Sequence, residues 1–297
     1  MKQAHNTNPG KLFRSLISSS HPLQIVGAIN PYCALLAKQA GFQAIYLSGA
    51  GIANAQFGLP DLGMTSLTEV AYEVKKITNI CNLPLLVDAD TGWGDILNVE
   101  RTVKELEYAG AAGIHLEDQI QAKRCGHLNN KRLISVDEMT LKIKVAVNSK
   151  ANKDFVIMAR TDAVAVEGLD AAIERMKNYI SAGADMIFAE ALYKLDDYKK
   201  VTDSINVPVL ANITEFGKTP LFTVDELANA GVQLILYPLS AFRAMSKSAL
   251  ETYNAILNHK TQKSCIQSMQ TREELYKTLG YYDYEKKLDQ YLIEVQE

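Results

Sequence analysis

The segment Ala109-Gly110-Ala111-Ala112-Gly113-Ile114-His115-Leu116-Glu117-Asp118 decides the fold of this chain, because its plan occurs four times. An Ala-Gly pair comes first and a short apolar run follows, closed in three of the four copies by a polar group. Ala40-Gly41, Ala182-Gly183 and Ala230-Gly231 open the other copies. Glycine suits the left-handed end of a helix before the chain turns into a strand. The repeat therefore predicts helices that alternate with strands.

Eight apolar runs rich in Val, Ile and Leu predict buried strands. Capping-box signals open several of the intervening helices, with a glutamate three residues after Ser66, Ser135 and Thr223. Strands that are apolar throughout indicate a parallel sheet covered on both faces. Eight such units predict an α/β fold of the closed (β/α)8 TIM type, with an open doubly wound sheet as the alternative. The predicted strands are residues 24–29, 44–49, 84–90, 112–118, 155–161, 184–190, 208–214 and 232–238.

Composition excludes several classes of protein. The net charge of -3 argues against a nucleic-acid binder, whose basic face usually shows in the totals. No apolar run reaches the length that crosses a bilayer, and residues 1–10 lack the apolar core of a signal peptide. The four cysteines lie far apart, which makes disulfide and structural zinc sites weak interpretations and favours a reducing, cytoplasmic setting. They are Cys33, Cys81, Cys125 and Cys265.

The chain of 297 residues, of which 47% are hydrophobic, has enough apolar side chains for a sizeable core. We expect a single barrel domain over residues 1–297. Residues 1–20 would form an N-terminal arm of this domain, and residues 250–297 a C-terminal helical extension.

Polar groups end six of the eight predicted strands. In a barrel these carboxyl ends converge on one face, where barrel enzymes carry their active sites. The plainer interpretation is that polar residues simply mark strand ends. A ring of this kind favours an active site, and its members are Ser48, Asp88, Asp90, Glu117, Asp118, Arg160, Asp162, Glu190, Asn212 and Thr214.

Asp88 and Asp90 form the predicted metal site. They alternate along one strand, so both carboxylates point the same way and would repel each other without a cation between them. Oxygen ligands favour a hard ion, Mg²⁺ with several waters retained, and Mn²⁺ is the alternative. Asp61 and Glu117 could hold those waters from neighbouring loops. The competing interpretation has one carboxylate capping a helix and the other solvated.

The run Lys123-Arg124-Cys125-Gly126-His127-Leu128 places a thiol and an imidazole beside two fixed cations. Cations bias a thiol toward thiolate, so Cys125 could exchange protons near neutral pH. His127 could polarise a substrate oxygen, and a solvated basic loop is the alternative.

Two arginines, together with Lys123 and the metal, form the predicted pocket for a small polyanion, and Tyr46 is a separate candidate. Arg160 suits a substrate carboxylate, with a structural pair to Glu190 or Asp162 as the alternative. Arg243, just after the last strand, is a second candidate anion ligand. Tyr46 could act as a base if its pKa is lowered, or could be a core residue.

Five motifs resemble the isocitrate lyase/phosphoenolpyruvate mutase superfamily, and above all its branch that acts on 2-methylisocitrate. The resemblance runs from residue 23 to about residue 282. The thiol run is specific to lyases of the superfamily, because its mutases lack it. The motifs are Tyr46-Leu47-Ser48-Gly49, Val87-Asp88-Ala89-Asp90-Thr91-Gly92, Lys123-Arg124-Cys125-Gly126-His127, Asn212-Ile213-Thr214-Glu215-Phe216-Gly217 and Leu236-Tyr237-Pro238-Leu239-Ser240-Ala241-Phe242-Arg243.

The resemblance implies a barrel whose last helix is exchanged with a neighbouring subunit, in a homotetramer built from two dimers. The implied reaction is a retro-aldol-type cleavage of a small tricarboxylate into succinate and pyruvate, within propionate catabolism. Metal ligation would fall on Asp88 and Asp90. Substrate contacts would fall on Ser48, Gly49, Ala50, Cys125, Gly126, Arg160, Glu190, Asn212, Ile213, Thr214, Arg243 and Arg272.

The catalytic residues that we expect are Tyr46 as base and Cys125 as the acid that protonates carbon, with Lys123, His127 and Arg160 around the substrate. Two positions depart from the branch: Leu128 stands where arginine is usual, and Ala50 where glycine is usual. Both departures should change the affinity for the substrate more than the type of reaction. The alternatives are an isocitrate lyase, an oxaloacetate hydrolase or decarboxylase of the superfamily, and a barrel without catalytic activity.

Overall fold

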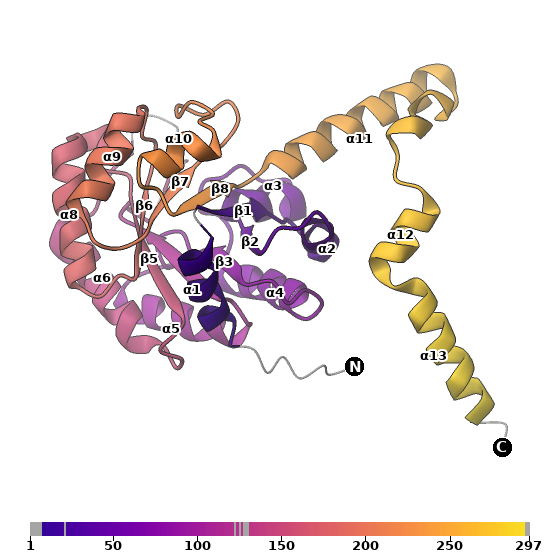
Figure 1. Cartoon of the computed structure of the whole chain (residues 1–297), viewed down its shortest axis with the longest axis horizontal. Coiled ribbons are helices and arrows are strands. Elements are labelled where there is room, and N and C mark those ends of the chain that lie inside the picture. Colours follow the sequence, from indigo (N-terminus) through magenta and orange to yellow (C-terminus); the bar gives the residue numbers. More distant parts are fainter. Residues whose placement is uncertain (1–7, 21, 122, 125, 127–130, 295–297) are drawn as a thin grey trace. The chain divides into compact units, whose positions relative to one another are not determined.

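The computed structural model describes residues 8–20, 22–121, 123–124, 126 and 131–294 (Figure 1). The chain divides into two compact units, Met1–Ser240 and Ala241–Glu297. The single domain expected over residues 1–297 stays a prediction.

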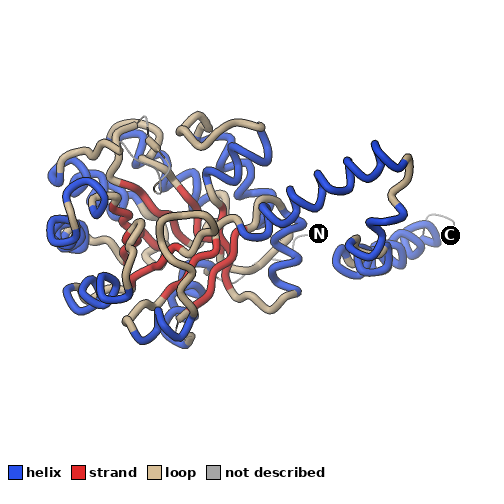
Figure 2. Tube along the Cα trace, turned by 90° about the horizontal axis from the view of Figure 1, so that it is seen from above, coloured by secondary structure: helices blue, strands red, loops and turns tan. Residues whose placement is uncertain are grey.

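The first unit contains a closed barrel of eight parallel strands in sequence order, in which β8 pairs with β1. Its strands (red) lie inside a layer of helices (blue) in Figure 2. The (β/α)8 barrel is therefore confirmed, and every observed strand overlaps the run predicted for it. The strands are β1 (Leu23–Gly27), β2 (Ala44–Leu47), β3 (Leu85–Asp88), β4 (Gly113–Glu117), β5 (Val156–Thr161), β6 (Met186–Ala189), β7 (Val209–Asn212) and β8 (Leu234–Tyr237).

The helix caps and helix ends predicted from the sequence are present in the structure. Ser66 and Thr223 form reciprocal capping boxes, and the Ser135 side chain accepts a hydrogen bond from the Glu138 N–H. The glycine of each Ala-Gly pair has a φ between 81° and 103°, the left-handed region expected there. The helices of this unit are α1 (Pro9–Ser19), α2 (Pro31–Gln39), α3 (Gly49–Phe57), α4 (Leu67–Thr78), α5 (Ile96–Tyr108), α6 (Val136–Ser149), α7 (Val164–Glu167), α8 (Leu169–Ser181), α9 (Leu195–Ser204) and α10 (Val224–Asn229).

Helix α1 covers the end of the barrel at which the strands begin. Its Phe13 and Ile17 join the apolar cluster that fills the barrel interior, and Phe13 is completely buried. Arg14 holds the helix in place, because its Nε donates to the Asp154 carbonyl (2.8 Å) and its Nη2 pairs with Asp185 Oδ1 (2.7 Å). The opposite end, where the strands finish, stays available for a site.

The second unit consists of α11 (Ser240–His259), a 3-10 helix (Lys263–Ser268), α12 (Arg272–Leu279) and α13 (Tyr281–Glu294). None of the described residues in these four helices is buried. The rings of Tyr276 and Tyr281 stack with their centroids 4.3 Å apart. Across the described parts of both units, no helix has the length and apolar character needed to cross a membrane.

The role of α1 gives a stability prediction. Phe13→Ala should lower the free energy of unfolding by about 3–5 kcal/mol, because it leaves a cavity at the end of the barrel that α1 closes. Urea denaturation followed by circular dichroism measures the change. Tyr108→Ala, at an aromatic side chain that is 86% exposed, is the control and should shift stability by less than about 0.5 kcal/mol. Equal losses in the two variants would contradict the role of α1.

Candidate active site

The predicted polar ring assembles where the strands end. Its described members come from β2 through β7 and the residues that directly follow these strands, and each is less than 10% exposed. Polar groups buried at this density require partners, so their contacts define the site. The buried members are Ser48, Asp88, Asp90, Glu117, Asp118, Arg160, Asp162, Glu190, Asn212 and Thr214.

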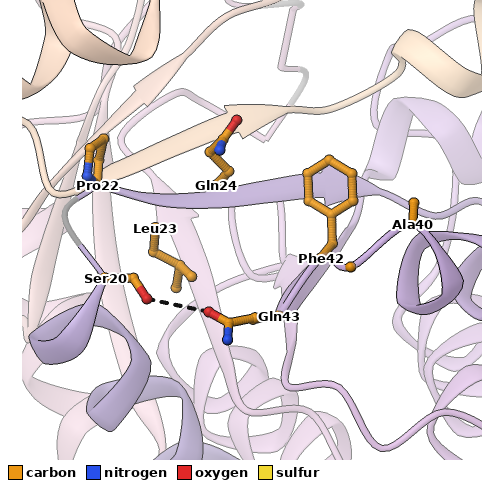
Figure 3. A pocket seen from close by; sticks show the side chains of 8 residues that line it. Ser20, Pro22, Leu23, Gln24, Ala40, Phe42 and Gln43 are labelled. Atoms are coloured by element: carbon orange, nitrogen blue, oxygen red, sulfur yellow. Dashed lines mark hydrogen bonds between the residues drawn. The ribbon is translucent and has the colours of Figure 1, made fainter.

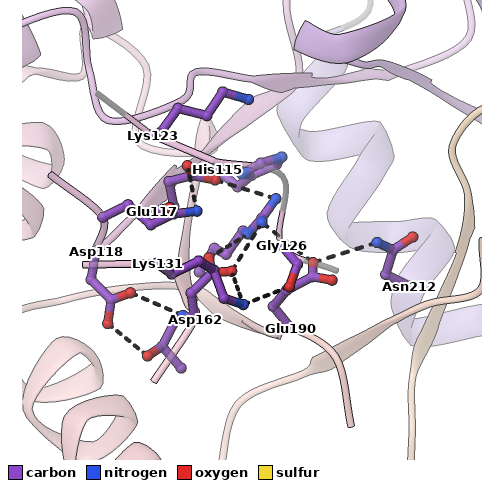
Figure 4. A network of polar contacts seen from close by, with 12 residues as sticks. His115, Glu117, Asp118, Lys123, Gly126, Lys131, Asp162, Glu190 and Asn212 are labelled. Atoms are coloured by element: carbon purple, nitrogen blue, oxygen red, sulfur yellow. Dashed lines mark hydrogen bonds and ion pairs between the residues drawn. The ribbon is translucent and has the colours of Figure 1, made fainter. Parts of the chain in front are cut away.

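Three buried carboxylates of this ring surround Arg160. They belong to Glu117, Asp162 and Glu190, which Figure 4 labels. Arg160 binds Asp162 through Nε–Oδ2 (3.0 Å) and Nη2–Oδ1 (3.3 Å). Its Nη1 lies 3.3 Å from Glu117 Oε2, and its Nη2 lies 3.6 Å from Glu190 Oε2. Burial alone would lower the pKa of Arg160, but the three carboxylates raise it well above its ordinary value. The structural pair weighed from the sequence is thus present with both candidates, and contact with a substrate carboxylate stays a prediction.

Asp88 and Asp90 converge, although for a different reason than the sequence suggested. Strand β3 ends at Asp88, and Asp90 follows in a turn with a φ of 46°, so strand alternation does not align them. Instead the Asp90 N–H donates to Asp88 Oδ1 (3.1 Å). A Cβ placed on Gly49 would lie 3.2 Å from both Asp88 Oδ2 and Asp90 Oδ1, which shows that these two oxygens face the same point.

Lys123 supplies the cation that faces this carboxylate pair. Its Nζ lies 2.8 Å from Asp90 Oδ1 and donates to Asp61 Oδ1 at 2.5 Å. Burial would lower the pKa of Lys123, but Asp90, Glu117 and the other nearby carboxylates raise it well above its ordinary value. Burial and the Asp88 charge raise the pKa of Asp90 to about 6, against the effect of Lys123. The carboxylates are therefore only partly neutralised by the described side chains.

The donor set fits Mg²⁺ as a partly hydrated ion. Asp90 Oδ1 has only the ion pair with Lys123, without hydrogen-bond alignment, and Glu117 Oε2 accepts no hydrogen bond from a described residue. All the candidate ligands are carboxylate oxygens, which Mg²⁺ prefers, and that ion commonly keeps waters while it takes one or two carboxylates. No cluster of three or more His, Cys, Asp or Glu side chains suited to a metal occurs among the described residues. Asp88 and Asp90 with waters would therefore be the ligands, and Asp61 and Glu117 could hold the waters.

Tyr46 and His115 form a buried pair next to Asp88. The Tyr46 hydroxyl lies 2.9 Å from His115 Nε2 and 3.2 Å from Asp88 Oδ2. Burial and the Asp88 charge raise the pKa of Tyr46 well above its ordinary value, so the expectation of a lowered pKa is wrong. Burial lowers the pKa of His115 to about 4, which leaves the imidazole neutral. The pair can donate and accept hydrogen bonds, but Tyr46 is a poor base here.

The remaining substrate-contact candidates of the first unit line the same end of the barrel. Ser48 is the N-cap of α3, and its side chain accepts from Gly51 N. Gly49 and Ala50 form the first turn of that helix. The Gly49 N–H donates to Asp88 Oδ2 (3.0 Å), which ties the helix start to the metal candidate.

Strands β6 and β7 provide the opposite wall of the ring. Asn212 Nδ2 donates to Glu190 Oε2 at 3.4 Å. Ile213 uses its N–H in a bond to the Leu236 carbonyl and is 3% exposed, so its side chain packs. Thr214 is 8% exposed.

Gly126 reaches into the ring from the loop after β4. A Cβ placed on it would lie 2.5 Å from Arg160 Nη2 and 2.6 Å from Glu190 Cγ, so only glycine fits there. Cys125, His127 and Leu128 lie outside the described residues. Arg243 and Arg272 belong to the second unit, in α11 and at the start of α12. The site roles of these five residues stay predictions.

Two buried residues of the site were not predicted. Gln119 is 1% exposed and Lys131 7% exposed, and both contact the loop that carries Gly126. Gln119 directly follows Glu117 and Asp118, which is a weak signal. Nothing in the sequence around Lys131 distinguishes it from a solvated lysine.

A separate hollow lies where β1 and β2 begin, at the opposite end of these strands (Figure 3). The Ser20 hydroxyl donates to Gln43 Oε1 across it (3.3 Å). None of the described side chains that line it is ionisable. The lining residues are Ser20, Pro22, Leu23, Gln24, Ala40, Gly41, Phe42 and Gln43.

Comparisons with known proteins agree with this geometry. The family model for phosphoenolpyruvate phosphomutase matches residues 13–257. A 2-methylisocitrate lyase from Escherichia coli (strain K12) is 58% identical over 283 residues, which cover 95% of this chain and 96% of the relative. The crystal structure of a 2,3-dimethylmalate lyase superposes with a TM-score of 0.88 at 29% identity, covering 94% of both chains. A phosphonopyruvate hydrolase in complex with oxalate and Mg²⁺ has a TM-score of 0.85 at 27% identity, covering 96% of this chain and all of its own.

The Arg160 cluster gives a prediction about stability and pH. In Arg160→Met the carboxylates of Glu117, Asp162 and Glu190 lose their shared cation, which should cost about 3–5 kcal/mol. Without this cation, the buried Glu117, whose pKa burial already raises, would hold a proton in the folded variant that the unfolded chain releases above about pH 4, so the loss of stability should grow with rising pH.

Thermal unfolding in the presence of a chelator should therefore show a larger decrease in Tm at about pH 8 than at about pH 5.5. Arg101→Met is the control, because its side chain is 64% exposed and lies 4.0 Å from Glu105 Oε1. A decrease in Tm that is independent of pH would mean that Arg160 does not neutralise these groups.

Proposed function

The chain belongs to the phosphoenolpyruvate phosphomutase family, and on this premise we propose that it cleaves 2-methylisocitrate into succinate and pyruvate. The enzyme is a carbon–carbon lyase, as are its close relatives. The observation that carries the choice of substrate is the 58% identity to a 2-methylisocitrate lyase along 95% of the chain. We further propose that the reaction serves the methylcitrate cycle of propionate catabolism and takes place in the cytoplasm.

We propose Mg²⁺ as the cofactor, held by Asp88 and Asp90 with waters kept by Asp61 and Glu117. The metal would supply a Lewis acid for the hydroxy-carboxylate end of the substrate. The Mg²⁺ complex of phosphonopyruvate hydrolase supports this choice at the level of the superfamily. The deficit of positive charge around Asp88 and Asp90 supports it for this chain.

The protein side chains would carry out the proton transfers. Glu117 replaces Tyr46 as the proposed base, because its buried Oε2 accepts no hydrogen bond from a described residue and so can take a proton from the substrate side. As Glu117 takes the hydroxyl proton, the carbon–carbon bond breaks and the pyruvate carbonyl forms. Cys125 then gives a proton to the carbon of the succinate half.

Fixed donors would stabilise the charge that develops on the succinate half. Arg160, His127, Asn212 and Thr214 are the proposed donors, and Lys123 neutralises the carboxylates on the metal side. Tyr46, protonated and bonded to His115, donates a hydrogen bond toward Asp88. We expect Ser48, Gly49 and Ala50 to bind a substrate carboxylate at the start of α3, with Arg243 and Arg272 as further anion ligands.

We propose that the protein is a homotetramer of two dimers that exchange their C-terminal helices. The support within the chain is the second unit itself, whose four helices bury none of their described residues. Large apolar side chains with exposures of 53–61% occur there, among them Leu250, Tyr291 and Ile293. A second copy of the chain would cover them, because unpaired apolar surface of this kind is typical of an interface.

The function is tested by analysis of the products. Purified protein with 2-methylisocitrate and Mg²⁺ should release succinate and pyruvate in equal amounts, and a chelator should stop the reaction until Mg²⁺ is restored. Asp88→Ala, the control, should be inactive at every Mg²⁺ concentration. Faster cleavage of isocitrate, or release of oxalate or CO₂ from oxaloacetate, would favour the other enzymes of the superfamily. A failure to turn over or bind any of these carboxylates would indicate a barrel without catalytic activity.

The proposed role of Cys125 gives a second prediction for this reaction. Cys125→Ser should lower kcat by about 10²–10⁴-fold, because a hydroxyl is a much weaker acid toward carbon. Substrate affinity should be kept, as measured by the fluorescence of Trp93, the only tryptophan, whose Nε1 donates to the Thr65 carbonyl near the ring. Cys265→Ser, in the second unit, is the matched control. Normal turnover in Cys125→Ser would remove Cys125 as the acid.

A further inference from the structure

Two buried side chains hold the backbone on either side of position 125. The first is Gln119, whose Nε2 donates to the Arg124 carbonyl (2.8 Å) while its Oε1 accepts from the Arg124 N–H (3.0 Å). Its Nε2 also contacts Glu117 Oε1 at 3.2 Å. One amide side chain thus pairs with both backbone groups of the residue before Cys125.

The second is Lys131, which holds the residue after Cys125. Its Nζ donates to the Gly126 carbonyl at 2.5 Å and to Asp162 Oδ1 at 2.9 Å. The Lys131 side chain is 2% exposed and that of Asp162 is fully buried. Since Asp162 also binds Arg160 through both oxygens, one ammonium group connects the loop backbone to the partner of Arg160 (Figure 4).

The base of this loop is closed without Lys131. The Ile120 N–H donates to the Arg132 carbonyl (3.0 Å), and the Ile134 N–H donates to the Asp118 carbonyl (2.9 Å). Gln119 and Leu133 form an antiparallel bridge between the same segments. The bond from Lys131 to Gly126 therefore holds a point farther along the loop.

That point is where the loop packs on the charged ring. A Cβ added to Gly126 would lie 2.5 Å from Arg160 Nη2 and 2.6 Å from Glu190 Cγ. A buried lysine is costly unless it is paired and hydrogen-bonded, and Lys131 meets this condition with one loop carbonyl and one carboxylate. These contacts suit a Lys131 side chain that holds the loop backbone at a fixed position against the ring.

We infer that Lys131 and Gln119 are positioning residues, which fix the backbone at Gly126 and Arg124 and so hold this loop at a set position against Arg160 and Glu190. The kinetic part of this inference rests on the proposed lyase function. A displacement of about 1 Å in a reacting group can cost about 100-fold in rate. Loss of either side chain therefore acts mainly on the chemical step, because Arg160 keeps its pairs with Asp162, Glu117 and Glu190.

The first test compares Lys131→Met with Lys150→Met. Lys131→Met should lower kcat by about 100-fold with KM changed by less than about threefold. Lys150 is the matched control, because its Nζ lies 3.3 Å from Asp185 Oδ2 and its side chain is only 10% exposed. It lies beside the starts of β5 and β6, at the other end of the barrel. Lys150→Met should keep the wild-type kcat, although it also loses a largely buried ion pair.

The second variant, Gln119→Met, preserves side-chain volume and tests the inference if Lys131→Met does not fold. It should also lower kcat by at least about 10-fold with little change in KM. In the double variant the losses should be less than multiplicative, because both side chains hold the same segment. Fully multiplicative losses would contradict a shared role.

A readout without turnover separates this inference from the proposed function. Brief digestion of the native protein with trypsin should cut after the exposed Arg124 at least about 10-fold faster in Lys131→Met and Gln119→Met than in the wild type. Lys150→Met should be cut at the wild-type rate. If the wild type does not cleave 2-methylisocitrate, the proposed function fails. The rate of digestion still tests whether Lys131 and Gln119 hold the loop backbone.

Two results would overturn the inference. One is a cleavage rate after Arg124 within about twofold of the wild type in both variants, whatever happens to kcat. The other is faster cleavage with an unchanged kcat in an enzyme that is active on 2-methylisocitrate, which would make the two side chains purely structural.

Discussion

The structure depends on the burial of one arginine among three carboxylates. Arg160 contacts Glu117, Asp162 and Glu190, which are the last residue of β4 and the residues that directly follow β5 and β6. A guanidinium removed from water is stable only when such partners are already in place. The closed barrel supplies them, because neighbouring parallel strands finish at the same level. Glu117 and Arg160 are direct partners in the β4–β5 register.

The charges around this arginine do not balance, and the imbalance explains the character of the site. The buried carboxylates of the ring are those of Asp88, Asp90, Glu117, Asp118, Asp162 and Glu190, and the buried cations paired with them are Arg160, Lys123, Lys131 and Arg175. Six negative groups against four positive ones leave room for two more positive charges. In the protein without a metal, burial raises the pKa values of Asp90 and Glu117, so protons can make up the difference. A bound divalent cation would also balance the negative charge, and the carboxylate oxygens of Asp88 and Asp90 are suitable ligands for it.

The sequence predicted the barrel and the members of the ring because both follow from local patterns. The strands around Ile114 and Ile157 are apolar at consecutive positions, and the polar residues come where these strands end. The pKa values of the site residues could not be predicted from the sequence, because they depend on which strands are neighbours in the barrel. Tyr46 shows this: its high pKa results from its burial beside Asp88, a residue 42 positions away in the chain. Lys131 was missed for the same reason, since both of its partners are remote in sequence or belong to the backbone.

Backbone strain is concentrated at the end of the barrel that carries this charge. Five described residues other than glycine have a positive φ, and four of them, Asp90, Trp93, Ala191 and Phe216, follow β3, β6 or β7. Such conformations persist only where the surroundings determine them. For Asp90 that surrounding is the bond to Asp88, and for Trp93 it is the pair of bonds with Thr65 and Asn98. The other end of the barrel, closed by Phe13 and Ile17, carries no described residue of this kind. The fold therefore packs apolar side chains at one end of the barrel and holds a strained, charge-rich site at the other, where Arg160 contributes both to stability and to the site.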